Sequence, residues 1–269
     1  MTMPTIQEQM DLHNRTAIIT GGAGYLGRTM AHTLAEAGAN IVIVDINSEK
    51  IDTVCRELEE KWQVRTLGLT VDLEKKEERC QIASKVVEAF GSLDILVNNA
   101  AFVGTSNLTG WGVPFEQQET ETWRRALEVN LTAVFDITQT AAPYLKASGH
   151  GSIINVASIY GIVGPDPRLY TDLPMFNPAA YAASKGGVVQ FTKWCATVLA
   201  PEIRVNAITP GGIFRGHQDP FLSRYEYRTP LKRMAHEDDF IGATIFLASD
   251  LSKYVTGQNI VVDGGFSIW

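Results

Sequence analysis

The sequence is poor in cysteine and has neither a long apolar run nor an excess of positive charge. Its three cysteines, Cys55, Cys80 and Cys195, are widely spaced, so they predict reduced, buried thiols and no metal site. No apolar run approaches the roughly 20 residues that cross a membrane, and residues 1–14 are polar, unlike a signal peptide. The net charge of −7 disfavours nucleic acid and anionic membranes as partners. These absences together predict a cytoplasmic protein.

The sequence does contain a regular alternation of apolar runs and helical patterns. With 269 residues, 45% of them hydrophobic, it is long enough for one large α/β domain, residues 1–269. The apolar runs are continuous, which indicates strands covered on both faces. The predicted strands are 17–19, 40–44, 64–69, 93–97, 152–156, 203–208 and 259–262, and the predicted helices are 26–37, 49–61, 76–90, 122–148, 179–199 and 238–247. We therefore expect a doubly wound, seven-stranded parallel sheet with helices on both faces, the Rossmann fold.

Three segments between these elements are candidates for ligand binding. Segments 102–119 and 161–178 look irregular, and segment 211–229 is rich in Arg and aromatic residues. Each follows a predicted strand at its carboxyl end. Open α/β sheets bind their ligands at that edge, so we expect the functional site there.

A glycine-rich turn, Thr20-Gly21-Gly22-Ala23-Gly24-Tyr25-Leu26-Gly27, lies between the first predicted strand and the following helix. Gly21 and Gly24 allow the backbone to turn sharply and to approach a pyrophosphate closely. The N–H groups of the helix start, at Tyr25 and Leu26, would then face the phosphates. This context favours a dinucleotide site, and the alternative is a glycine-rich turn without a ligand.

Asp45 ends the second predicted strand and points to the type of dinucleotide. A carboxylate there can accept hydrogen bonds from both ribose hydroxyls and would repel the extra phosphate of NADP. No Arg follows in residues 46–48 to compensate, so the sequence predicts NAD. The alternative is an aspartate that caps a helix or turn. The other expected cofactor neighbours, after the third and fourth predicted strands, are Asp72, Leu73 and Asn99.

Tyr181 and Lys185 are four residues apart in a predicted helix and so share one helix face. A phenol must lose about three pKa units, roughly 4 kcal/mol, to act as a base near neutrality, and a neighbouring Lys or a bound nicotinamide would shift the pKa in that direction. Alone, the pair could equally be an aromatic anchor and a solvated lysine.

Ser158 follows the fifth predicted strand and could hydrogen-bond a substrate oxygen. Asn130, within a long helix, could bend that helix or hold a water that links Lys185 to solvent.

The order of these motifs resembles that of the short-chain dehydrogenase/reductase family over nearly the whole chain. The match consists of the glycine-rich turn, Asn98-Asn99-Ala100-Ala101, Asn130, Ser158, Tyr181-x-x-x-Lys185, Pro210-Gly211 and Val262-Asp263-Gly264-Gly265. The resemblance implies exchange of a hydride between a nicotinamide and an alcohol or carbonyl.

The resemblance also implies a role for each site residue. Tyr181 would be the acid/base, Ser158 would orient the substrate and stabilise an oxyanion, and Lys185 would bind the ribose and tune the pKa of the phenol. Asn130 would act as a relay. The expected cofactor neighbours after the sixth strand are Pro210, Gly211 and Ile213, with Ile213 touching the carboxamide. Family members are usually tetramers or dimers, which pair the helices that carry Asn130 and Tyr181, so we expect a homo-oligomer.

The glycine spacing departs from the family pattern, because Tyr25 stands where shorter members carry a glycine. This spacing is more like that of the longer epimerase and dehydratase branch, whose larger C-terminal substrate portion has no room in this chain. An epimerase-like or dehydratase-like enzyme that uses NAD is one alternative function. A non-catalytic NAD-binding scaffold is another, because a fold does not fix a function.

Two segments bear on the substrate, which we expect to be a sugar, a polyol or another polar hydroxy compound. Ser158 and Tyr181 are 23 residues apart, more than the family usually has, so residues 165–174 form an insertion. The insertion is either surface padding or a substrate contact. Residues 215–233, the basic segment, could hold an anionic group of the substrate, or could be a solvated helix face. Removing Arg215 or Arg224 should then weaken binding of an anionic substrate and spare the cofactor. The cations concerned are Arg215, His217, Arg224, Arg228, Lys232 and Arg233, with Arg168 of the insertion.

Overall fold

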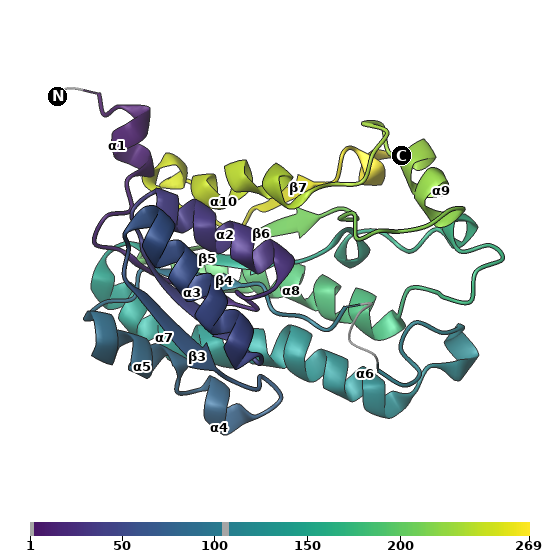
Figure 1. Cartoon of the computed structure of the whole chain (residues 1–269), viewed down its shortest axis with the longest axis horizontal. Helices are drawn as coiled ribbons and strands as arrows, with labels where there is room; N and C mark the ends of the chain where they lie inside the picture. Colours follow the sequence, from purple (N-terminus) through teal and green to yellow (C-terminus); the bar gives the residue numbers. More distant parts are fainter. Residues whose placement is uncertain (1–2, 104–107) are drawn as a thin grey trace.

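The computed structural model describes residues 3–103 and 108–269. Seven strands form one sheet in the order β3-β2-β1-β4-β5-β6-β7, with every neighbouring pair parallel. This order confirms the predicted doubly wound sheet (Figure 1). The strands are β1 (Thr16–Thr20), β2 (Asn40–Asp45), β3 (Thr66–Thr70), β4 (Ile95–Asn98), β5 (Gly151–Val156), β6 (Ile203–Pro210) and β7 (Asn259–Val262).

Helices cover both faces of this sheet. One face packs against α2, α3 and α10, and the other against α5, α7 and α8. Successive side chains of a strand point to opposite faces, so the neighbours Ile18 and Ile19 enter different cores. The helices are α1 (Ile6–Met10), α2 (Tyr25–Glu36), α3 (Ser48–Trp62), α4 (Lys76–Arg79), α5 (Ile82–Phe90), α6 (Thr120–Leu127), α7 (Ala133–Ser148), α8 (Ala179–Val198), α9 (Phe221–Arg228) and α10 (Ile241–Ala248).

The structure corrects three of the predicted elements. The helix predicted over 76–90 consists of two, α4 and α5, because the chain turns after Arg79. The helix predicted over 122–148 contains a π-helical turn, Glu128–Thr132, between α6 and α7. The segment 211–229 includes α9, which the sequence pattern did not reveal. Residues 104–107 of the segment predicted to be irregular lie outside the described residues.

Buried Arg79 connects the turn after β3 to the π-helical turn. Its Nε donates to the Asp136 carboxylate at 2.8 Å and its Nη1 to the Leu73 carbonyl at 2.7 Å, and Nη2 forms an ion pair with Glu128. Asp136 is buried as well. Because both charges are withdrawn from water, each depends on the other for compensation.

The carboxyl ends of the strands lie at one edge of the sheet, and the order of the strands reverses between β1 and β4. Ligands of doubly wound sheets bind at this point. The segments that follow β4, β5 and β6 gather at the same end of the molecule, beside α9 (Figure 1). Within the described ranges, no helix is both long and apolar enough to cross a membrane.

Candidate active site

The glycine-rich turn forms a cradle between β1 and α2. Gly21 has a φ of +62°, which favours glycine, and a Cβ on Gly27 would lie 2.2 Å from the Gly21 carbonyl oxygen. Asn99 fixes the turn, because its Nδ2 donates to the carbonyls of Thr20 at 2.9 Å and Gly21 at 3.2 Å. Among the described residues, no side chain caps α2 at Gly24. The first N–H groups of α2, from Tyr25 onward, therefore fit the pyrophosphate of a dinucleotide.

Asp45 lies at the end of β2, beside this turn. Its Oδ2 accepts a hydrogen bond from the Ala23 N–H at 3.2 Å, and its Oδ1 accepts one from the Ile46 N–H at 2.8 Å. The carboxylate thus stabilises the turn, as the capping alternative predicted. It is only partly buried, and a carboxylate has about four lone-pair sites, so it can also accept hydrogen bonds from a ribose.

The cofactor neighbours predicted after the third strand, Asp72 and Leu73, lie where β3 ends. Ile46 and Asp72 line one cavity of about 520 Å³, which brings the ends of β2 and β3 to a common hollow. The Asp72 carboxylate accepts the Glu74 N–H at 3.0 Å, which fixes the turn after β3. Leu73 packs against the hydrophobic core, and its carbonyl accepts the hydrogen bond from Arg79 described above.

Tyr181 and Lys185 occupy the first turns of α8, next to Ser158 at the end of β5. The Lys185 Nζ lies 5.9 Å from the centre of the Tyr181 ring and donates to the Val156 carbonyl at 2.6 Å. Within residues 3–103 and 108–269, that carbonyl is its one hydrogen-bond partner. An ammonium carries three donors, so this buried group can bind further oxygen atoms, such as ribose hydroxyls.

Burial controls the pKa values of this pair. It raises the pKa of the Tyr181 phenol, and a hydrogen bond with Ser158 offsets the rise only in part. Burial also lowers the pKa of the Lys185 ammonium to about 8. The expectation of a lowered phenol pKa is therefore wrong for the chain alone, because desolvation outweighs the hydrogen bond with Ser158.

Asn130 is fully buried in the π-helical turn and connects two site segments. Its Oδ1 accepts the Phe102 N–H at 2.7 Å, and its Nδ2 donates to the Ser184 hydroxyl at 3.2 Å. The side chain therefore fixes the segment after β4 against α8, which carries Tyr181. The water link from Asn130 to Lys185 stays a prediction.

The residues predicted near the carboxamide lie at the end of β6, beside β5. The Gly211 N–H donates to the Val262 carbonyl at 2.9 Å, and a Cβ on Gly211 would lie 2.8 Å from the Asp263 Cα. Ile213 pairs with Ala235 in an isolated bridge. Pro210, the last residue of β6, and these two residues are thereby held at the same sheet edge as Ser158.

The cations of the basic segment have partners within the chain. Arg224 donates to the Thr171 carbonyl of the insertion at 2.6 Å, and Arg228 pairs with Asp166 at 3.0 Å. Arg215 lies 4.4 Å from the centre of the Tyr25 ring, on the nucleotide side. These contacts favour the structural alternative over an anion-binding role, and the contact with Tyr25 places Arg215 by the cofactor turn.

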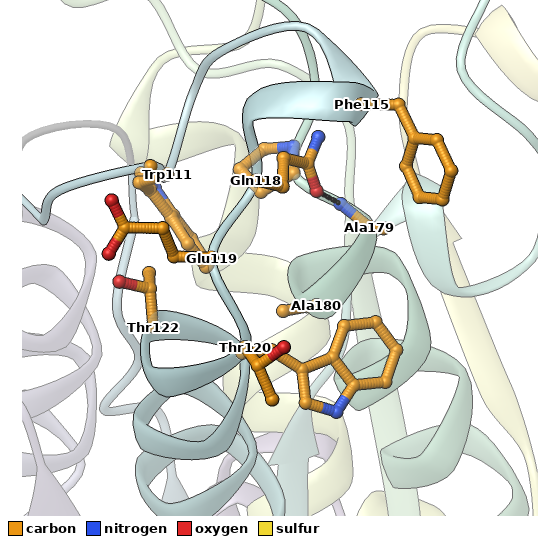
Figure 2. A pocket seen from close by; sticks show the side chains of 11 residues that line it. Trp111, Phe115, Gln118, Glu119, Thr120, Thr122, Ala179 and Ala180 are labelled. Atoms are coloured by element: carbon orange, nitrogen blue, oxygen red, sulfur yellow. Dashed lines mark hydrogen bonds between the residues drawn. The ribbon is translucent and has the colours of Figure 1, made fainter.

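The sequence interpretation missed Trp111, which packs edge-on against Tyr181 with ring centres 6.4 Å apart. Trp111 lines a cavity of about 390 Å³ between the starts of α6 and α8, and Figure 2 shows the side chains around it. Gln118 closes one wall by accepting the Ala179 N–H at 3.0 Å. The Trp111 Nε1 is buried without a hydrogen-bond partner among the described residues. No local motif marks this residue, because only folding brings it to Tyr181.

Sequence reasoning also missed Tyr160, whose hydroxyl lies 2.8 Å from that of Tyr170 in the insertion. Its position two residues after Ser158 was the available signal. Among the described residues, no group of three or more His, Cys, Asp or Glu side chains could hold a metal ion.

The sheet order, the glycine cradle and the buried Tyr–Lys pair match the pattern of a nucleotide-binding protein with an acid–base centre. A family model described as enoyl-(acyl carrier protein) reductase matches residues 22–267. The 3-oxoacyl-(acyl-carrier-protein) reductase FabG of Thermotoga maritima is 34% identical over 96% of this chain and 100% of its own length. The Probable galactose dehydrogenase GalD of Rhizobium meliloti is also 34% identical, over 98% of this chain and 99% of its own length. The chain belongs to the short-chain dehydrogenase/reductase family of oxidoreductases.

Solved structures of similar proteins contain either nicotinamide cofactor. An NAD+-bound xylitol dehydrogenase superposes with a TM-score of 0.83 at 28% identity, covering 94% of this chain and 99% of its own. A gluconate 5-dehydrogenase from Burkholderia cenocepacia, in complex with NADP and tartrate, superposes with a TM-score of 0.86 at 32% identity. The match covers 98% of this chain and 100% of the gluconate 5-dehydrogenase chain. The choice between the two cofactors must therefore come from this chain's own residues.

Proposed function

We propose that residues 1–269 act as one catalytic domain that interconverts a secondary alcohol and a carbonyl of a polar hydroxy compound with NAD. The observation that carries this proposal is the buried Lys185 ammonium one helical turn from Tyr181, beside Ser158. Burying a cation with a single protein partner is costly. A site that binds ribose hydroxyls through that cation accounts for it.

Each side chain has one task in the proposed oxidation. The Ser158 hydroxyl donates a hydrogen bond to the substrate oxygen, and the Tyr181 phenolate accepts the proton of the alcohol. Bound NAD supplies the acceptor for the hydride that leaves the carbon. Lys185 holds the ribose and favours the phenolate by its charge. Asn130 holds the π-helical turn, from which a water could pass the proton of Tyr181 to solvent. In the reverse direction the same groups return the proton and stabilise the oxyanion.

Asp45 supports NAD as the cofactor, and the proposal is tested by the variant Asp45→Asn. A carboxylate about 4 Å from a phosphate repels it by roughly 1–4 kcal/mol, depending on solvent exposure. Wild type should therefore prefer NAD, and in the variant the ratio of kcat/KM for NAD to kcat/KM for NADP should fall by at least about fivefold. The measurement is NADH and NADPH formation at matched cofactor concentrations. Asp52→Asn, on the exposed side of α3, is the matched control. A wild-type preference for NADP would contradict the assignment.

Two alternative functions are separated by a single assay. Nicotinamide absorbance is followed while the protein is incubated with NAD and a panel of polyols and sugars. A dehydrogenase produces NADH, whereas an epimerase-like enzyme gives product without net NADH. A scaffold binds NAD and converts nothing. The chain spans the full length of the curated relatives named above, which include a reductase and a sugar dehydrogenase by name. This coverage favours the dehydrogenase.

We also propose that the chain forms a homo-oligomer through α7 and α8. Phe135 and Trp194 are 42% and 55% exposed, and both rings contact Phe191, at 5.9 and 6.2 Å between centres. Contiguous exposed aromatic groups are typical of protein–protein interfaces.

The variant Trp194→Glu tests this interface. Each buried, unpaired carboxylate costs several kcal/mol, so the variant should shift the protein to a smaller assembly, measured as molar mass by light scattering after size exclusion. Ile6→Glu, an equally drastic change on exposed α1, should leave the mass unchanged. A monomeric wild type, or a variant with unchanged mass, would show that α7 and α8 do not form the interface.

A further inference from the structure

The hydroxyls of Tyr160 and Tyr170 form a hydrogen bond of 2.8 Å that joins the active site to the insertion. Tyr160 belongs to the short 3-10 turn Ile159–Gly161, directly after Ser158. Its N–H donates to the Ser158 hydroxyl oxygen at 3.2 Å. The Tyr160 ring is therefore fixed relative to the residue proposed to hold the reacting oxygen.

Either hydroxyl can donate in this bond, and the surroundings of Tyr170 favour donation by Tyr170. Tyr170 is 7% exposed and packs between Phe176 and Phe221, with ring centres at 4.9 and 5.6 Å. In the described part of the chain, its hydroxyl bonds to Tyr160 alone. If Tyr160 donated, the proton of Tyr170 would be left among apolar rings, at a cost of about 1–3 kcal/mol. Donation by Tyr170 avoids this cost and leaves the partly exposed Tyr160 its own proton for another acceptor.

The insertion holds Tyr170 firmly in this position. Its Thr171 carbonyl accepts a hydrogen bond from Arg224, and its Asp166 carboxylate pairs with Arg228 and with Arg168 at 2.8 Å. These contacts fix both ends of the segment that carries Tyr170. Surface padding would not need such anchors. Burial raises the pKa of Tyr160, and the nearby charges of Tyr170 and Tyr181 add to the rise, so Tyr160 stays a neutral donor near the reacting atoms.

We propose that Tyr160, oriented by Tyr170, is a specificity-determining residue that donates a hydrogen bond to a second oxygen of the substrate, close to the reacting carbon. The substrate class is then a secondary alcohol with a neighbouring hydroxyl or carboxylate, and simple alcohols are poor substrates. This inference rests on the proposed function, because it needs the alcohol to be held by Ser158 and Tyr181.

Three small alcohols that share one reacting group test the proposal. Isopropanol, propylene glycol and lactate each carry a secondary alcohol beside a methyl group, and differ in having no second oxygen, a hydroxyl or a carboxylate. NADH formation is measured for wild type, Tyr160→Phe and Tyr170→Phe. We expect Tyr160→Phe to lower kcat/KM for at least one of the two oxygenated substrates by about fivefold or more relative to isopropanol. Tyr170→Phe should act in the same direction with a smaller effect.

The comparison with isopropanol separates substrate recognition from damage to the fold. Tyr227→Phe, on the exposed face of α9, is the matched control and should behave as wild type. An effect on propylene glycol alone identifies a hydroxyl as the partner, and one on lactate alone identifies a carboxylate. An equal loss for all three alcohols, or none, would overturn the proposal and leave the proposed function standing. Absence of NADH from these alcohols and from the polyol panel would overturn both.

Discussion

Replacing Tyr181 by Phe should lower kcat by about 10²- to 10⁴-fold, the usual contribution of a positioned acid or base. The variant keeps the ring that packs against Trp111 and removes only the hydroxyl proposed to accept the proton. NADH absorbance gives kcat, and NADH fluorescence gives the Kd of the cofactor, which should change little. The loss would therefore belong to the chemical step.

The control for this variant is Tyr254→Phe, which removes a hydroxyl from a fully exposed ring. It should retain the kcat of wild type. If Tyr181→Phe also retained it, the acid–base assignment would fail, and a different group would have to take the proton. The alternative scaffold function would then regain weight if wild type itself formed no NADH.

Replacing Arg79 by Met should lower the free energy of unfolding by about 3–5 kcal/mol, the cost of leaving a buried charge unpaired. Arg79 is 1% and Asp136 5% exposed, so the carboxylate would lose its cation without gaining water. Urea unfolding followed by circular dichroism measures the change. Because Arg79 also contacts Leu73 and Glu128, we expect a weaker affinity for the cofactor as well.

Two further variants show whether burial is the cause. Arg125→Met breaks an ion pair with Glu74 whose side chains are 42% and 29% exposed, and should cost at most about 1 kcal/mol. The double variant Arg79→Met/Asp136→Leu also lacks the carboxylate that the first substitution leaves unpaired. Its free energy of unfolding should therefore be higher than that of Arg79→Met alone. Equal costs for the two arginine variants would contradict this explanation.

The sequence predicted the architecture because its strands are buried on both faces. Continuous runs such as that before Asp45 give a strong local signal, and β7 begins and ends where the pattern indicated. The break between α4 and α5 was not predictable in this way. A periodic pattern treats an arginine as a solvent-facing residue, whereas Arg79 points inward to partners about 50 residues further along the chain.

Helix α9 shows the same limit. Its sequence is polar and aromatic, and its stability comes from tertiary contacts, with Phe221 against Tyr170 and Tyr225 stacked on Phe266 at 4.7 Å. Such contacts override a weak local preference.

The residues of the candidate site also differ in whether a local sequence pattern reveals them. The candidate acid–base residues could be proposed from the sequence because they follow strand ends or share a helix face within a few residues. Trp111 and Tyr160 were missed because their neighbours, Tyr181 and Tyr170, lie far along the chain. The direction of the Tyr181 pKa was also missed, since it depends on burial, which spacing does not reveal. A spacing identifies groups that can meet, and only the packing sets how strongly each holds its proton.

The anchoring of the insertion has a practical consequence for redesign. Arg228 contacts Asp166 of the insertion and also exchanges hydrogen bonds with Trp269, through its Nη2 and its carbonyl. A designer who grafts residues 165–174 into a relative would transplant Tyr170 without Arg224 and Arg228 of α9, whose guanidinium groups hold the insertion. The insertion, α9 and residues 266–269 should therefore be exchanged as a single cassette, and shuffling libraries that place crossovers between them should yield few active chimeras.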